Sequence, residues 1–137
     1  MSIRLQVAAT ILGFTFTANA ALSQDKSEIL IMGGRNFDIF LGCLTCSDVD
    51  PRSVWNKMSR YGWENKLGIW NSIGPHKSKF SMNSACNQYS TTPPKLVDRT
   101  GGYYGQLSTN TYLADSVCGP NGAERICMAL RVMCAED

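Results

Sequence analysis

The sequence predicts an α+β fold: a small antiparallel sheet from two β-hairpins with short repeated helical segments and a disulfide-tethered C-terminal helix. Three observations lead to this prediction. Two pairs of β-forming runs each surround a Gly-rich turn, a pattern around Asn recurs in the middle of the chain, and the last residues carry an apolar stripe.

Residues 1–20 have the composition of a secretory signal peptide. Arg4 supplies a positive charge, residues 5–17 are apolar and uncharged, and the Ala-Asn-Ala of residues 18–20 fits a signal-peptidase site. The apolar run of about 13 residues is shorter than the roughly 20 that cross a bilayer. We therefore expect a secreted or periplasmic protein, with residues 21–137 as one disulfide-rich domain and no membrane span after cleavage.

Two hairpins are expected to build the sheet. Residues 29–32 and 37–41 are rich in β-forming side chains and flank a Gly/Asn turn. Residues 95–98 and 103–109 repeat this arrangement around a second Gly-Gly turn. Gly105 inside the last run indicates a bulge or a close approach of another backbone segment.

A pattern of six residues recurs between the two hairpins. It reads SVWNKM at residues 53–58, GIWNSI at 68–73 and SACNQY at 84–89. Apolar residues at i, i+1 and i+4 are typical of one side of a short helix, and Asp50-Pro51 would supply an N-cap and a first-turn proline. The pattern therefore predicts three short helical segments joined by tight loops.

The C-terminal segment carries the strongest helix pattern. From Ala123 onward the apolar residues have the spacing of a single stripe that faces inward; they are Ile126, Cys127, Leu130, Met133 and Cys134. Each cysteine on this stripe is expected to bond to the body of the domain. Residues of about 115–137 would then form a helical staple on a core module of about 29–110.

The six cysteines are expected to form a disulfide framework, as is typical of a small exported chain; they are Cys43, Cys46, Cys86, Cys118, Cys127 and Cys134. Cys127 and Cys134 would lie roughly 10 Å apart along the helix, beyond the reach of a disulfide of about 7 Å. If Cys43 pairs with Cys46, two arrangements remain. These are Cys86–Cys127 with Cys118–Cys134, and Cys86–Cys134 with Cys118–Cys127.

The C-x-x-C of Cys43 and Cys46 admits other interpretations besides a structural disulfide. A redox dithiol should open a helix after a strand, and the nearby Asp48 and Asp50 disfavour a thiolate. A zinc site would need a second pair of ligands. The chain has one histidine, His76, interpreted as a surface loop residue. No metal site and no cofactor are predicted.

Other functional signals are weak. Removal of Arg4 leaves 12 basic residues (13 minus 1) against 11 acidic ones, and no dense basic patch marks a nucleic-acid surface. No nucleic acid is therefore predicted as a partner. The chain lacks an H-E-x-x-H, a P-loop, a Rossmann fingerprint and a G-x-S-x-G, so catalytic residues are predicted as none and an enzyme is disfavoured.

Aromatic and Asn side chains are the candidates for ligand binding. Aromatic faces beside amides suit sugar rings or peptides. Trp55 and Trp70 are assigned to the core, and an Asn that bonds the neighbouring backbone is the structural alternative to a binding role. The candidate binding residues are Trp63, Tyr103, Tyr104, Asn56 and Asn71.

These motifs together resemble a small bacterial secreted module that is largely uncharacterised. The resemblance rests on FLGCLTC at residues 40–46, on the repeated S-[IV]-W-N units, and on the second hairpin through Asn110. The module sometimes adjoins extracellular nuclease domains. The chain departs from it at Cys86, where the repeat has Trp, and in the cysteine-bearing tail after Asp115.

Three functions follow as hypotheses. The favoured one is an exported, non-catalytic binding module for an envelope glycan or protein. The second is a periplasmic thiol-disulfide or metal-binding protein that uses Cys43 and Cys46. The third, implied by the resemblance, is an accessory or inhibitor of an extracellular nuclease or hydrolase.

Overall fold

A computed structural model describes residues 28–136 of the chain. The signal peptide expected at residues 1–20 lies outside them. The described part contains a four-stranded antiparallel sheet and one helix, so the predicted α+β class is confirmed. The strands are β1 (Leu30–Gly33), β2 (Ile39–Cys43), β3 (Lys95–Val97) and β4 (Tyr103–Gln106), and the helix is α1 (Glu124–Ala135).

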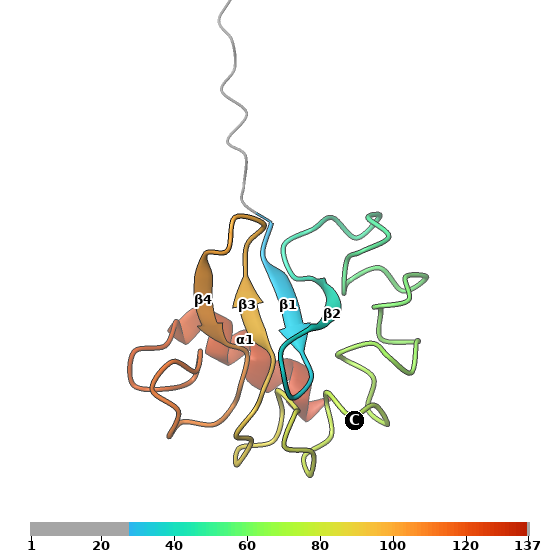
Figure 1. Ribbon diagram of the computed structural model, residues 1–137. Coiled ribbons are helices and arrows are strands. Elements are labelled where there is room, and N and C mark those ends of the chain that lie inside the picture. Colours follow the sequence, from blue (N-terminus) through green and yellow to red (C-terminus); the bar gives the residue numbers. More distant parts are fainter. Residues whose placement is uncertain (1–27, 137) are drawn as a thin grey trace, which may run out of the picture.

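The sheet joins both predicted hairpins through the pairing of their first strands. Its order is β2-β1-β3-β4, and β1 pairs antiparallel with β2 on one side and with β3 on the other (Figure 1). Ile31 in β1 is opposite Gly42 and Leu96, and its side chain is fully buried. The sheet thereby places residues more than 60 positions apart in direct contact.

Both features expected at Gly105, an irregularity of the strand and a close approach of another backbone segment, are confirmed. The register of β3 and β4 shifts between Lys95 and Val97, which marks an irregularity in the pairing. Gly105 has a φ of 99°, and a Cβ there would lie 2.6 Å from the carbonyl oxygen of Asp115. Only glycine fits this combination of backbone angle and close approach.

The three short helical segments predicted at residues 53–58, 68–73 and 84–89 are wrong. Among residues 44–94 the structure has turns and bends and no helix. We call residues 50–90 the turn chain, because its backbone N–H groups bond carbonyls three residues earlier at nearly every third position. The donors of these bonds are residues 53, 56, 59, 62, 65, 68, 71, 74, 81, 84 and 90.

Polar side chains explain why this segment forms turns instead of helices. The first residue of most turns is Ser, Asn or Asp, and its side-chain oxygen accepts the N–H two residues later, as in Ser53 to Trp55 and Asn71 to Ile73. An N–H held in this way cannot donate to the carbonyl four residues back, as a helix requires. The side chains of Asn and Ser at these positions therefore accept the N–H groups that helical hydrogen bonding would need.

The C-terminal helix is tethered as the apolar stripe predicted. Cys134 bonds to Cys86 and Cys127 bonds to Cys118, while Cys43 bonds to Cys46. This is the second of the two arrangements that the sequence left open. Helix α1 lies behind β3 and β1 in Figure 1, and its Leu130 joins the same buried cluster as Ile31 and Leu96.

Candidate functional site

The turn chain displays large apolar side chains at its turn tips. The third residue of a turn often points into solvent, because the first residue uses its own side chain to hold the backbone. Met58, Ile73 and Phe80 are 96%, 87% and 93% exposed, although each is a side chain that normally contributes to a core. The turns therefore hold apolar groups outward on backbone that is fixed by hydrogen bonds.

Three aromatic side chains line one groove: Phe80 and Tyr89 lie at tips of the turn chain, and Tyr112 lies in a turn after β4. Phe80 follows Ser78, Tyr89 follows Asn87 and Tyr112 follows Asn110, and in each case the N–H of the aromatic residue bonds the preceding Ser or Asn side chain. The three rings line a cavity of about 760 Å³ together with Arg131 of α1. We call this cavity the aromatic groove; its other lining residues are Lys79, Cys86, Gln88, Thr109 and Thr111.

The wall of the aromatic groove includes a covalent anchor and an unmet polar group. The Cys86–Cys134 disulfide ties the turn chain to α1 beside the groove. Thr109 Oγ1 is buried and has no hydrogen-bond partner among the residues that the structure describes. A buried hydroxyl without a partner is unfavourable.

The charges that line the aromatic groove have one sign. Lys79 and Arg131 line it, and none of its nine lining residues is Asp or Glu. The groove therefore combines aromatic faces with hydrogen-bonding groups and a positive potential.

Asn56 and Asn71, predicted as candidate binding residues, use both ends of their amides within the fold. Asn56 Oδ1 accepts the N–H of Met58, and its Nδ2 donates to the carbonyl of Asp50. Asn71 makes the same pair of bonds to Ile73 and Trp63. Both side chains hold neighbouring turns together. This is the structural role, a bond from the Asn side chain to nearby backbone, that the sequence offers as the alternative to ligand binding.

The structure does not bring the other three candidates, Trp63, Tyr103 and Tyr104, into the aromatic groove. Trp63 is half-buried, packs against the core and has Lys57 Nζ 5.6 Å from its ring centre. Tyr103 and Tyr104 lie on β4 and are each 48% exposed. None of the three lines the groove.

The Tyr103 and Tyr104 hydroxyls each donate to a carboxylate. The Tyr103 hydroxyl bonds Asp115, and the pKa of Tyr103 is raised by burial and by this carboxylate. The Tyr104 hydroxyl donates to Asp98 at 2.8 Å. Bonds from the Thr100 hydroxyl, the Gly102 N–H and the Tyr104 hydroxyl lower the pKa of Asp98 to about 2.

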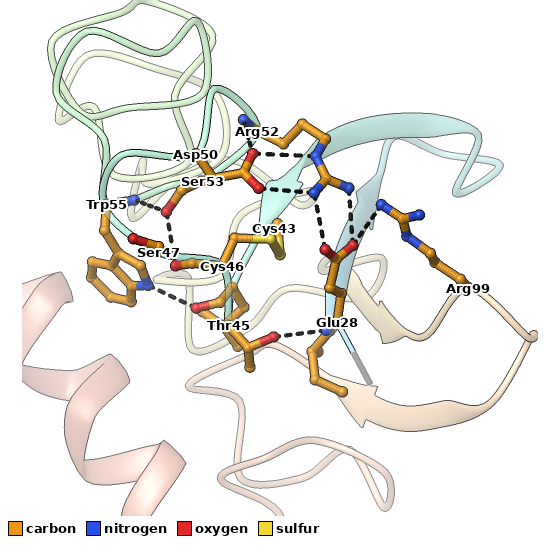
Figure 2. Close-up of a disulfide and its surroundings, with 12 residues drawn as sticks. Glu28, Cys43, Thr45, Cys46, Ser47, Asp50, Arg52, Ser53, Trp55 and Arg99 are labelled. Atoms are coloured by element: carbon orange, nitrogen blue, oxygen red, sulfur yellow. Dashed lines mark hydrogen bonds and ion pairs between the residues drawn. A yellow bond between two sulfur atoms is a disulfide. The ribbon is translucent and has the colours of Figure 1, made fainter. Parts of the chain in front are cut away.

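The Cys43–Cys46 disulfide lies in a loop held from several sides (Figure 2). Thr45 Oγ1 accepts the N–H of Ile29, Trp55 Nε1 donates to the carbonyl of Leu44, and Ser53 Oγ donates to that of Cys46. Cys43 is fully buried, and the strand that carries it leads into a turn rather than a helix. The burial of Cys43 and these hydrogen bonds fix the loop that carries the disulfide.

A group of ion pairs lies beside this disulfide. Arg52 makes two bonds of 2.9 Å to Glu28 and a third of 2.8 Å to Asp50, and Arg99 pairs with Glu28 from the other side (Figure 2). Hydrogen bonds from Arg52 lower the pKa of Glu28 and of Asp50, and these carboxylates raise the pKa of Arg52. The network links residues before β1 to the start of the turn chain.

Glu28 and the two sulfurs lie within 4.8 Å of one another, which is the spacing of a metal-ligand group. The sulfurs are joined in a disulfide and hold no thiolate to give. In this state the sulfurs offer no ligand to a metal, and a thiol-disulfide role for Cys43 and Cys46 stays a hypothesis.

His76 lies in a turn, as expected, but the prediction that it is a surface residue is wrong. It is 8% exposed, and burial lowers the pKa of its imidazole. Its carbonyl accepts the N–H of Ala85 and the hydroxyl of Ser84. These two bonds hold residues 84 and 85 against the backbone of His76.

Sequence reasoning missed Phe80, Tyr89, Tyr112 and Arg131 as site residues. The available signal was an aromatic residue two positions after Ser or Asn, which occurs at Phe80, Tyr89 and Tyr112 but also at Trp55 and Tyr61, which pack against the core. The pattern places each ring in a turn. It carries no information about which rings share a groove.

No family model, curated protein or solved structure matches the chain. The resemblance to a bacterial secreted module stays a prediction. No helix among residues 28–136 has the length and apolar character needed to cross a membrane. Three disulfides fit a protein of an extracellular or other oxidising environment.

Proposed function

We propose that this protein is an exported, non-catalytic binding module and that its aromatic groove holds a segment of a cell-envelope glycan. The observation that carries the proposal is the presence of three exposed aromatic side chains, Phe80, Tyr89 and Tyr112, around one cavity of about 760 Å³. The apolar face of a sugar ring packs on an aromatic ring, and its hydroxyls bond polar side chains at the edge.

The rigidity of the groove supports a binding role. Each aromatic residue has its backbone N–H bonded to a side chain two positions earlier, and the Cys86–Cys134 bond holds the turn chain to α1. A surface that is ordered before binding loses little conformational entropy when the ligand arrives. Exposed aromatic groups held in this way are costly for solubility and gain their value from a ligand.

The charge of the groove favours a glycan with acidic substituents. Lys79 and Arg131 are the cations among its lining residues, which include no Asp or Glu. Stable binding to a nucleic acid backbone draws on many cations, whereas this chain has a net charge of only +2. A sugar chain that carries occasional carboxylates fits two cations and three rings better.

The chemistry of the cysteines favours an exported protein, and export supports the same proposal. The segment before residue 21 has the pattern of a signal peptide, and all six cysteines are paired in disulfides. A cytosolic location would keep these thiols reduced. An envelope or extracellular glycan is then a ligand that the exported protein meets.

The test is binding of the exported, oxidised protein to an array of envelope polysaccharides, neutral and uronate-containing, followed by titration calorimetry. Tyr89→Ala and Tyr112→Ala are expected to weaken glycan binding at least fivefold each, because each removes one stacking face. Ile73→Ala is the matched control: it truncates an equally exposed turn tip that does not line the groove. Its affinity should equal that of the unmodified protein.

Other outcomes contradict the proposal. Binding that survives both tyrosine variants but is lost in Tyr103→Ala places the ligand on β4 instead. Retention of single-stranded nucleic acid without any glycan shows that the rings stack on bases. No glycan binding by the folded protein removes the proposed ligand class.

A further inference from the structure

A second cavity, separate from the aromatic groove, lies between α1 and the paired rings of Trp55 and Trp70. Its volume is about 250 Å³, and nearly all of its lining atoms are apolar. We call it the helix cleft; it is lined by Leu44, Trp55, Trp70, Leu107, Arg125, Ile126, Ala129, Leu130 and Met133. It shares no lining residue with the aromatic groove.

The helix cleft is formed by the part of the apolar stripe that the core leaves uncovered. Cys127, Leu130 and Cys134 are buried, as the stripe predicts. Ile126, on the same stripe, is 39% exposed, and Met133 is half-buried. Both line the cleft, so this face of α1 has apolar surface against which no side chain of residues 28–136 fills the space.

The opposite wall consists of the two stacked indoles. The rings of Trp55 and Trp70 lie 5.6 Å apart at 26°. Trp55 Nε1 donates to the carbonyl of Leu44, whereas Trp70 Nε1 is buried without a partner among the described residues. A 150 Å³ apolar cavity in another protein is known to accept benzene, so a cavity of about 250 Å³ has room for roughly ten heavy atoms.

One charged residue, Arg125, lines the helix cleft. It lies in the first turn of α1 and makes no hydrogen bond or ion pair within residues 28–136. The neighbouring Glu124 lines a different cavity. The N-terminal end of a helix also attracts negative charge. An apolar slot with a cation and a helix N-terminus at its edge is complementary to an anionic amphiphile.

We propose that the helix cleft binds a medium-chain carboxylate, with an acyl chain of about eight carbons against the indole pair and the carboxylate at Arg125. The chain length follows from the volume of the cleft. The apolar lining favours an alkyl chain over a sugar or a peptide, whose buried polar groups would be left without partners. The single cation selects a carboxylate over a neutral or cationic head group.

Intrinsic tryptophan fluorescence tests this proposal, because two of the three tryptophans line the cleft. The oxidised protein is titrated with sodium octanoate, octan-1-ol and octylamine, each below its aggregation concentration. Octanoate is expected to change the emission with saturation and to bind at least fivefold more tightly than octylamine. Arg125→Gln should lose this preference while its affinity for octan-1-ol stays unchanged.

A space-filling variant separates the cleft from other apolar surface. Ala129→Phe places a ring in the cleft wall and should abolish binding of both octanoate and octan-1-ol. Val132→Phe adds the same ring to an exposed position of α1 that lines no part of the cleft and should bind normally. Circular dichroism confirms that both variants keep the helix.

Three results would overturn the proposal. Octanoate binding that is unaffected by Ala129→Phe shows that the ligand lies elsewhere. Equal affinity for octanoate and octylamine shows that Arg125 does not select the head group. A dimer in sedimentation that dissociates in Ala129→Phe shows that a second copy of the chain occupies the cleft.

Discussion

At the scale of single residues, the polar side chains of the turn chain act as backbone groups. Ser59 donates to the carbonyl of Pro51, Ser84 to that of His76 and Ser90 to that of Met82, each eight residues earlier. Asn side chains add a donor and an acceptor at once. The irregular middle of the protein is therefore ordered by side-chain hydrogen bonds that replace those of helices and sheets.

Asn71→Ala should destabilise the protein by about 2 kcal/mol, because it leaves the N–H of Ile73 and the carbonyl of Trp63 without partners. Asn65→Ala is the matched control. Asn65 accepts the N–H of Leu67, and its Nδ2 has no protein partner within the described residues, so its loss should cost about 1 kcal/mol. Urea denaturation of both variants measures the difference. Equal losses would contradict the bridging role of Asn71.

His76 is expected to make the stability of the protein fall as the pH drops below about 6.5. Burial lowers its pKa in the folded protein, whereas the unfolded chain binds a proton near the ordinary pKa of about 6.5. The unfolded state then holds more protons, so its contribution to stability is present above pH 6.5 and is lost as the pH falls.

His76→Gln should flatten this dependence, which is read as the change in the free energy of unfolding between pH 7.5 and 5. His76 is the one histidine of the chain. The carboxyls of Glu28, Asp50 and Asp98 have lowered pKa values and act below this window. An unchanged slope in the variant would assign the effect to other groups.

At the scale of elements, the turn chain depends on close approaches between successive turns. Gly62 and Gly68 begin turns in positions where other turns have Ser or Asn. A Cβ on Gly68 would lie 2.0 Å from the carbonyl oxygen of Gly62. The chain is thus so tightly coiled here that a side chain has no space.

Gly68→Ala is expected to cost more than about 2 kcal/mol, because the added methyl group forces two backbone segments apart. Lys66→Ala, at an exposed position of the same turn, should stay within about 0.5 kcal/mol of the unmodified protein. Thermal unfolding compares them. A Gly68→Ala protein of unchanged stability would show that the turns can separate at no cost.

At the scale of the whole molecule, the disulfides act over very different lengths of chain. Cys86–Cys134 spans 48 residues, Cys118–Cys127 spans 9 and Cys43–Cys46 spans 3. The first joins the turn chain to α1, which otherwise lies against the sheet through side chains alone. A disulfide stabilises the fold by restricting the unfolded chain, and the contribution of Cys86–Cys134 to stability is accordingly the largest of the three.

Replacement of each cysteine pair by alanines should lower the free energy of unfolding in that order, most for Cys86–Cys134 and least for Cys43–Cys46. Loop-closure entropy gives losses of about 4, 3 and 2 kcal/mol for the long, middle and short loops. Guanidinium denaturation of the three double variants measures the ranking. If the Cys43–Cys46 variant were the least stable, that loop would hold more of the fold than its length implies.

Local patterns were sufficient for the regular elements. Runs of β-forming residues around glycine predicted both hairpins, and the spacing of Cys127, Leu130 and Cys134 predicted the helix and its two anchors. The same reasoning failed for the turn chain. Apolar residues at i, i+1 and i+4 occur in a short helix and also in turns that repeat every three residues.

The binding surfaces were largely beyond sequence reasoning. The rings of the aromatic groove come from turns near residues 80, 89 and 112, and Arg131 comes from α1. The sequence points to Trp63, Tyr103 and Tyr104 because aromatic residues are frequent in that part of the chain. Proximity in the chain does not report proximity in a fold whose turns fold back on one another.

The sequence by itself determined the strands, the helix and the exclusion of a Cys127–Cys134 bond, because these depend on neighbours within a few residues. Only the tertiary structure decided which of the two remaining disulfide arrangements forms. It also decided that His76 is buried and that Phe80, Tyr89 and Tyr112 lie around one cavity. The physical reason is that polar side chains compete with backbone carbonyls for the same backbone N–H groups. Ser and Asn side chains satisfy the backbone locally, which prevents helices and leaves the path of residues 50–90 to contacts between distant parts of the chain.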